Sequence, residues 1–383
     1  MKPIRRRASP KTIPFLAMRF VLIWLSILSI GGCESQEPLR IGFVGTLSGK
    51  AALLGTAGRD GVLLAIEECN RQGGVNGRKV ELLVKDDGNE AEQAKKVDQE
   101  LINAGVSAIL GHMSSEMTAA VYETVMASGL VLLSPTVSSV EFSGLDDNML
   151  RVAGTSDALT RGLAGHCATQ KGWKQAAIIY DMANKAYSLS YADLFERAFA
   201  ATGGRIIRRI SFVSGTDALS MKAIAKQALE DNPDGVLVIA ASLDAAILCQ
   251  QLKKINPNIS LASSGWAFTE ELVQNGGKAV EGIVLPSYYQ PHSPEAAYVA
   301  FKKSFEQRFG YPSSFAASLG YEAATVVLAG LKEASSPRQL KETLLRMQRF
   351  PGLRGDLVFD RLGDIQRPFT LLTVRDGRFS EMQ

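Results

Sequence analysis

Two patterns of apolar and polar residues alternate along the chain from residue 38 onward. Continuous apolar runs such as LRIGFVGT, VSAILGH and LVLLSP predict short buried strands. Stretches with apolar residues at helical spacing lie between them, among them GRDGVLLAIEECNRQG, EAEQAKKVDQELINAG and SEMTAAVYETVMASG. Strands that alternate with helices predict βαβ units around a parallel sheet. Strands this apolar are expected where helices cover both faces of the sheet.

The alternation restarts after the residues near 153. Strand-like QAAIIYD, RIIRRISFV, GVLVIAAS, SLASSG and EGIVLPSYY are separated by helical segments, and further helices and strands close the chain. Because no Gly/Ser-rich linker separates the halves, short crossovers near 153–156 and 284–287 indicate two lobes joined by a hinge. The predicted fold class is therefore α/β, with two Rossmann-like parallel-sheet lobes. Since parallel sheets bind ligands beyond the carboxyl ends of their strands, two facing lobes would form a cleft.

The N-terminus differs in composition from the rest of the chain. Six cations and no acid precede an apolar core, FVLIWLSILSI, that is too short to span a bilayer but has the length of a signal-peptide core. The core ends in Ile30-Gly31-Gly32-Cys33, which resembles the lipobox of bacterial lipoproteins. This resemblance implies a signal peptide at 1–32, lipidation of Cys33 after cleavage, and a short tether at 33–37. An ordinary secretion signal and an uncleaved membrane anchor are the alternatives.

Loss of this leader changes the net charge of the chain. The full chain has 42 Lys and Arg against 39 Asp and Glu, a net charge of +3, and removal of the six leader cations leaves 36 − 39 = −3. A mildly acidic protein without a basic stripe has no electrostatic basis for binding nucleic acid.

Motifs of metal binding and catalysis are missing from the sequence. Cys69, Cys167 and Cys249 lie in helix-like segments without metal-type pairing, and the chain has only three histidines. We interpret these cysteines as small buried thiols, although a disulfide between two of them is permitted. The sequence contains no phosphate-binding loop, dinucleotide fingerprint or GxSxG elbow. We therefore expect neither a metal site, nor a cofactor, nor an enzyme.

Short motifs follow one another in a fixed order along nearly the whole mature chain. The stretch IGFVGTLSGKAALLGTAGRDGVLLAIEECNRQGGVNGRKVELLVKDD comes first. Later motifs are GHMSS (111–115), LLSPTVS (132–138), YD (180–181), GYEAA (320–324) and LVFDRLGD (357–364). This order resembles the type I periplasmic binding proteins, in the branch that serves branched-chain amino acid (Leu/Ile/Val) ABC transporters. The resemblance implies a Venus-flytrap receptor with lobe I at 38–153 plus 287–349 and lobe II at 154–286 plus 350–383.

Two loops of lobe I are implied to grip the ligand. In the family, the serine loop and the loop after the fourth strand hold the ligand's carboxylate and ammonium groups. Carried over residue by residue, this nominates Ser115, Thr136 and Ser138, with Met113 and Ser114 beside them. The proline in LLSPTVS agrees with this role, because it ends the strand ladder and leaves the next amides and hydroxyls free. Helix capping by the same hydroxyls is the alternative, and it is compatible with ligand contact.

Three turns of lobe II are implied to complete the site. YDMANKAYS resembles the family's loop in which an aromatic ring closes over the ligand, and this nominates Tyr187. AASLD occupies the position of another ligand-lining turn, so Ala241 and Ser242 are expected to leave room for the ligand. SSGWAF follows a third strand, and Trp266 at its tip is expected either to stack on the ligand or to pack in the core.

Two positions depart from the amino acid binders of the family. Leu54 stands where those proteins often carry a tyrosine, and Gly265 aligns with the carboxylate that pairs with the ligand's ammonium group. A buried ammonium group without a partner is costly. Either another acid replaces that carboxylate, with Asp181, Glu116 and Asp244 as candidates, or the ligand has no amine. Amides, urea-like compounds and carboxylates stay open, and the aromatic residues of lobe II favour a bulky apolar or aromatic ligand.

We therefore predict a monomeric, lipid-anchored solute-binding protein of the periplasm or cell envelope. It would close on a small amino acid, amide or carboxylate and then dock on a membrane ABC permease. A receptor that passes its ligand-bound state to a membrane sensor is the alternative, because the same fold serves both purposes.

Overall fold

A computed structural model of the chain describes residue 1, residues 37–49 and residues 51–382. Pro38–Gln383 forms a compact unit by itself. The predicted signal peptide and Cys33, apart from the first residue, lie outside the described part of the chain. Within that described part, no helix combines the length and the apolar character needed to cross a membrane.

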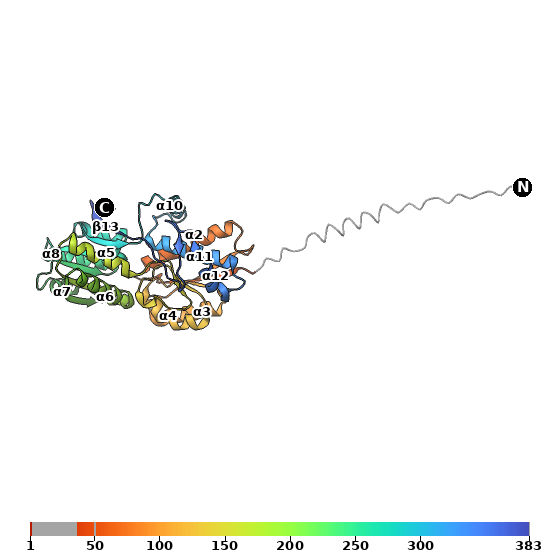
Figure 1. Ribbon diagram of the computed structural model, residues 1–383, viewed down its shortest axis with the longest axis horizontal. Coiled ribbons are helices and arrows are strands. Elements are labelled where there is room, and N and C mark those ends of the chain that lie inside the picture. The colour runs from red at the N-terminus through yellow and green to blue at the C-terminus, as the bar shows by residue number, and fades with distance from the viewer. Residues whose placement is uncertain (2–36, 50, 383) are drawn as a thin grey trace. The chain divides into compact units, whose positions relative to one another are not determined.

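The first sheet has five strands, and all of its strand pairs are parallel. Their order is β2-β1-β3-β4-β5. The strands are β1 (Leu39–Gly45), β2 (Val80–Asp86), β3 (Ile109–Leu110), β4 (Leu132–Ser134) and β5 (Met149–Arg151). Figure 1 shows the helices of this part, where α2 packs on α11 and α3 packs on α4. These helices are α2 (Ala52–Arg71), α3 (Ala91–Asn103), α4 (Ser115–Ser128) and α11 (Phe315–Glu333). We call this part lobe I.

The second sheet has seven strands in the order β14-β13-β10-β9-β8-β6-β7. The strands are β6 (Gln175–Asp181), β7 (Arg205–Phe212), β8 (Gly235–Ile239), β9 (Ser260–Ser263), β10 (Val284–Ser287), β13 (Thr370–Arg375) and β14 (Arg378–Glu381). Its helices are α5 (Ser156–Thr169), α6 (Lys185–Ala201), α7 (Ala218–Ala228), α8 (Ser242–Ile255) and α9 (Glu270–Gly276). We call this part lobe II. The remaining elements are α10 (Ala296–Phe309), α12 (Leu340–Met347), β11 (Arg349–Phe350) and β12 (Leu357–Val358).

Alternation along the strands explains why both faces of each sheet are covered. In β6, Ala177 and Ile179 join the apolar cluster that contains α7 and α8 side chains, whereas Ala176 and Ile178 join the cluster of α5 and α6. Successive side chains of a strand point to opposite faces. A strand that is apolar at every position therefore needs a helix layer on each side, as the sequence predicts.

Glycines let α2 and α11 approach each other closely in lobe I. A Cβ atom built on Gly61 would lie 2.0 Å from the carbonyl oxygen of Ala317, and one on Gly320 would lie 2.3 Å from that of Gly58. Any side chain at these two crossing points would push the helices apart. The GYEAA motif thus places α11 against α2, and α11 also contributes residues to the cavity described below.

The antiparallel edge of lobe II is a feature that the sequence analysis did not predict. β13 pairs antiparallel with both β10 and β14. The turn between β13 and β14 contains Asp376 and Gly377, whose φ angles of 51° and 67° suit a tight hairpin turn. The rest of the sheet is parallel, so the predicted two-lobed α/β architecture is correct apart from this hairpin.

The contacts of the last segment bear on where the chain passes between the lobes, for which the sequence analysis expects a position at 350. Asp364 accepts hydrogen bonds from Arg151 at 2.7 Å and from the amide of Gly144 at 2.9 Å, and both donors belong to lobe I. The amide of Leu353 donates to Glu322 of α11 at 2.8 Å. The chain then enters the lobe II sheet at Thr370, which pairs with Ser287. These contacts favour a crossover at 365–369.

Candidate functional site

One cavity lies where the carboxyl ends of the strands of both sheets meet. It measures about 840 Å³, counting the space at its mouth, which is in the range of small-molecule sites. Its lining residues come from both lobes and from the segment that follows α12. They are Leu54, Met113, Ser114, Ser115, Thr136, Ser138, Ala153, Leu159, Asn184, Tyr187, Gly265, Trp266, Pro286, Ser287, Tyr288, Tyr289, Phe315, Ser318, Leu319, Glu322, Leu353, Arg354 and Arg367.

The serine loop reaches the cavity because α4 begins there. Ser114 caps α4, and its hydroxyl oxygen accepts a hydrogen bond from the amide of Met117 at 3.3 Å. Ser115 is buried at the first position of the helix and lines the cavity. The start of a helix carries a partial positive charge. Ser115 therefore presents its side chain where a negatively charged or oxygen-bearing group is stabilised.

The loop after β4 lies beside the serine loop, as the family resemblance implies. Ser134 donates to the carbonyl of His112 at 2.8 Å, and Thr136 donates to the carbonyl of Met113 at 2.6 Å. Ser138 shares a 3.0 Å hydrogen bond with Ser156. These bonds fix the loops to each other. Thr136 and Ser138 both line the cavity, and their hydroxyl oxygens can accept further hydrogen bonds.

A buried histidine between two carboxylates supports the serine loop from behind. The Nδ1 atom of His112 lies 2.8 Å from Asp87, and its Nε2 atom lies 3.1 Å from Asp98. Burial opposes the charged imidazolium, but the carboxylates of Asp98 and Asp87 outweigh it and raise the pKa of His112 to about 9. The charged ring holds the loop next to the cavity without lining the cavity itself.

The lobe II wall is aromatic. Tyr187 follows β6 and Trp266 follows β9, and their rings meet edge to face with centroids 5.7 Å apart. Burial raises the pKa of the Tyr187 phenol, so this group stays neutral at physiological pH. Gly265 also lines this wall, and a Cβ atom there would lie 2.7 Å from the carbonyl oxygen of Pro286. The absence of a side chain at this position is therefore required by the local packing.

Ala241 and Ser242 differ from the other predicted contacts, because neither lines the cavity. Ala241 precedes α8, and Ser242 begins that helix in a buried position. The hydroxyl of Ser242 donates to Glu271 at the start of α9. The two residues thus shape the helix junction of lobe II. All other predicted contacts, including Leu54, lie on the wall of the cavity.

The acids considered as ammonium partners are engaged elsewhere. Asp181 accepts amide hydrogen bonds from Ala183 and Ser214, both at 2.9 Å, and Asp244 accepts from the hydroxyl of Ser214 at 2.5 Å. Glu116 accepts from the amide of Ala186 at 2.7 Å. None of the three lines the cavity.

Glu116 instead connects the two lobes beside the cavity. Its carboxylate caps the N-terminus of α6 through Ala186, and its own amide donates to Asn184 at 3.1 Å. The amide of Val140 in lobe I also reaches Ser190 in lobe II at 3.4 Å. These hydrogen bonds cross the cleft, so they stabilise the arrangement in which both lobes line one cavity.

Three charged residues line the cavity that the sequence analysis did not nominate as ligand contacts. Glu322 of α11 holds Arg367 through two hydrogen bonds of 2.5 and 3.2 Å, and it accepts from the amide of Leu353. Arg354 donates to the carbonyl of Tyr288 and lies 5.9 Å from the centroid of the Tyr289 ring. Burial and the neighbouring Arg367 lower the pKa of Arg354. Glu322 lies in the GYEAA motif, but that motif did not indicate a role in the cavity, and Arg354 and Arg367 lie outside the quoted motifs. The three residues come together only in the folded chain.

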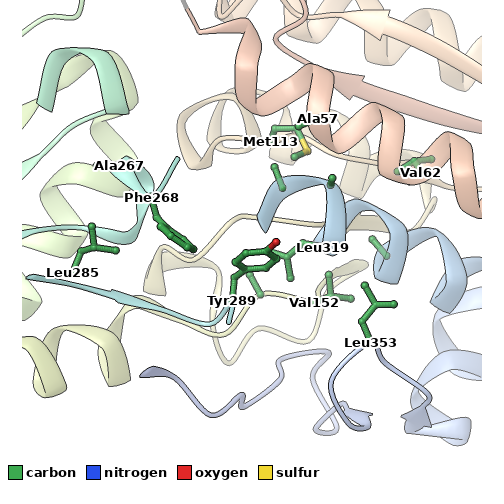
Figure 2. Close-up of a cluster of buried hydrophobic side chains, with 14 of the residues drawn as sticks. Ala57, Val62, Met113, Val152, Ala267, Phe268, Leu285, Tyr289, Leu319 and Leu353 are labelled. Atoms are coloured by element: carbon green, nitrogen blue, oxygen red, sulfur yellow. The ribbon is translucent and has the colours of Figure 1, made fainter. Parts of the chain in front are cut away.

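The apolar part of this wall comes from the same distant segments. Figure 2 shows Tyr289 after β10, Leu319 on α11 and Leu353 after α12, all within one buried apolar cluster. Phe268 packs against Tyr289 with ring centroids 5.7 Å apart. This cluster joins residues of both sheets, so the hinge region is part of a continuous core.

A family model described as "Periplasmic binding protein" matches residues 38–378. The chain belongs to the periplasmic binding protein family. The family is one of solute-binding proteins rather than enzymes, and it indicates a periplasmic location. The predicted resemblance and the predicted fold class are therefore confirmed.

Relatives whose names or structures specify a ligand have low sequence identity to this periplasmic binding protein. The leucine-, isoleucine-, valine-, threonine- and alanine-binding protein of Pseudomonas aeruginosa is 23% identical over 340 residues, which cover 87% of this chain and 88% of that protein. The substrate-binding protein LivJ of Streptococcus pneumoniae, solved with isoleucine, superposes with a TM-score of 0.82 at 23% identity, covering 90% of this chain and 98% of that chain. A solute-binding protein of Rhodopseudomonas palustris, solved with benzoate, gives a TM-score of 0.78 at 21% identity, covering 90% and 95%.

Proposed function

We propose that this protein captures a small amino acid, or a related carboxylate or amide, and delivers it to a membrane ABC importer. The observation that supports this function is the cavity between the lobes. Lobe I supplies hydroxyl groups and the start of a helix, and lobe II supplies aromatic rings. Few polar groups on a largely apolar wall are typical of a site that orients a small ligand.

Binding is coupled to closure of the lobes in this proposal. A ligand that contacts both walls has a higher affinity for the closed form, and only such a difference in affinity shifts the equilibrium. The hydrogen bonds of Glu116 with Ala186 and Asn184 add to the stability of that form. The closed form then docks on the permease. Lipidation of Cys33, which lies outside the described residues, would keep the monomer at the membrane.

The experiment that tests this function is a thermal-shift screen of the chain from residue 34 onward. The protein is unfolded and refolded first, so that a carried-over ligand is removed. Amino acids, their amides and amine-free carboxylates are then added separately. A compound that binds only the folded state raises the melting temperature, because its binding free energy adds to that of folding. A panel in which no compound of any class changes the melting temperature would contradict the proposed function.

The site itself is tested by removing hydroxyl groups. Ser115→Ala combined with Ser138→Ala is expected to abolish binding of the ligand found in the screen while the protein still folds. The matched control is Ser335→Ala combined with Ser336→Ala, because both serines are exposed and far from the cavity wall. Affinity that is equal in the two double variants would refute the proposed contacts.

A further inference from the structure

The charges on the cavity wall do not balance. Among the described residues, the charged side chains that line it are Glu322, Arg354 and Arg367. Glu322 and Arg367 neutralise each other through a two-point ion pair, with side chains only 2% and 6% exposed. Arg354 is left with a carbonyl oxygen and an aromatic face as its partners. The wall therefore carries one uncompensated positive charge.

A guanidinium group in this position has unused hydrogen-bonding capacity. Arg354 has five N–H donors in a planar fork, and the structure gives an acceptor for one of its nitrogen atoms, in the carbonyl of Tyr288. The side chain is half-buried, so bulk water compensates the charge only in part. A planar carboxylate matches the geometry of this fork, because its two oxygen atoms can accept at once.

Among the residues that the structure describes, the same wall has no comparable partner for an ammonium group. Glu322 is the lining carboxylate, and its two oxygen atoms already accept three hydrogen bonds from Arg367 and Leu353. At Gly265, an added side chain would meet the carbonyl oxygen of Pro286. An ammonium group would thus add a second uncompensated positive charge to a partly desolvated wall, which is unfavourable.

We propose that the ligand is an amine-free carboxylate whose anionic group pairs with Arg354. This inference rests on the proposed function and assigns the ligand class of that site. The aromatic wall of Tyr187 and Trp266 receives the apolar body of the ligand. Ser115 is then available for a further oxygen atom of the ligand.

Pairs of compounds that differ in one group test the ligand class. Leucine is compared with 4-methylpentanoate, phenylalanine with 3-phenylpropanoate, and benzamide with benzoate, by calorimetric titration of the refolded protein. The expected result is tighter binding of the amine-free carboxylate in each pair that binds. Tighter binding of the amino acids would overturn the inference and leave the proposed function intact. Failure of all six compounds would count against both.

Arg354→Gln tests the residue. The variant is expected to weaken the best carboxylate by about 10- to 100-fold, as for loss of a hydrogen bond to a charged group. The matching amide should weaken by less than about 3-fold. Arg361→Gln is the control, because it removes the same charge from an exposed site that does not line the cavity. Equal loss of carboxylate and amide binding in Arg354→Gln would overturn the assignment.

Arg354→Lys separates a role in binding from a role in folding. Lysine keeps the positive charge but lacks the planar fork. It is expected to retain the melting temperature of the ligand-free protein and to bind the carboxylate with an affinity between those of the wild type and Arg354→Gln. Wild-type affinity for the carboxylate in both Arg354 variants would refute the pairing.

Discussion

Removing Arg367 should expose how strongly the hinge depends on one buried ion pair. The guanidinium of Arg367 is bound to Glu322 at 2.5 and 3.2 Å and to the carbonyl of Val152 at 3.1 Å. Arg367→Met leaves the carboxylate of Glu322 buried, with the amide of Leu353 as its remaining partner. Removal of one member of a buried pair costs about 3–5 kcal/mol. The variant should therefore lose about this much free energy of unfolding.

The assay is urea unfolding of the ligand-free protein, followed by circular dichroism. Arg349→Met is the matched control, because Arg349 pairs with Asp356 at 2.7 Å while their side chains are 66% and 47% exposed. Exposed pairs contribute about 0–1 kcal/mol. The double variant Glu322→Gln with Arg367→Met should recover part of the loss, because a neutral amide still accepts from Leu353. A loss for Arg367→Met no larger than for Arg349→Met would refute the reasoning.

Three further predictions concern closure, specificity and pH. Glu116→Ala removes a hydrogen bond across the cleft and should weaken ligand affinity about 10-fold through faster dissociation; an unchanged dissociation rate in stopped-flow measurements would contradict this. Gly265→Ala should lower the free energy of unfolding by about 1–3 kcal/mol, because its Cβ would crowd the carbonyl oxygen of Pro286. An unchanged free energy in urea unfolding would contradict this, because it would mean that β10 shifts at no cost. The raised pKa of His112, about 9, makes its contribution to stability complete below pH 6.5, and this contribution is lost as the pH rises through 9. Wild type should therefore lose more unfolding free energy between pH 6.5 and 9 than His112→Gln, and equal losses would exclude this linkage.

The hydroxyl-rich loops nominated from the family resemblance lie on the wall of the cavity. Ser115 begins the helix after β3, Thr136 and Ser138 lie in the loop after β4, and the carboxyl ends of parallel strands meet at one edge of a sheet. The family resemblance nominated these residues, and this rule explains why they lie on the same wall. Their contact with a ligand remains a prediction.

Ala241 and Ser242 show where this local reasoning stops. They also follow a buried strand, β8, but Ser242 donates a hydrogen bond to Glu271 of α9 and does not line the cavity. The direction of a side chain at a strand end depends on which helix packs beside it. That choice is made by contacts between elements, and a short motif does not contain it.

The sequence by itself determined the layers of this protein. Apolar strands separated by amphipathic helices have one favourable arrangement, a parallel sheet covered on both faces, and the pattern occurs twice. Only the tertiary structure decided the charge of the cavity. Three charged residues, Glu322, Arg354 and Arg367, are distant from the serine loop in sequence. Glu322 reaches the cavity because α11 packs on α2, and the two arginines reach it because the segment after α12 runs along the cavity wall. Periodicity reports which face of an element is buried, whereas the partner of a buried charge is set by packing between elements that are remote along the chain.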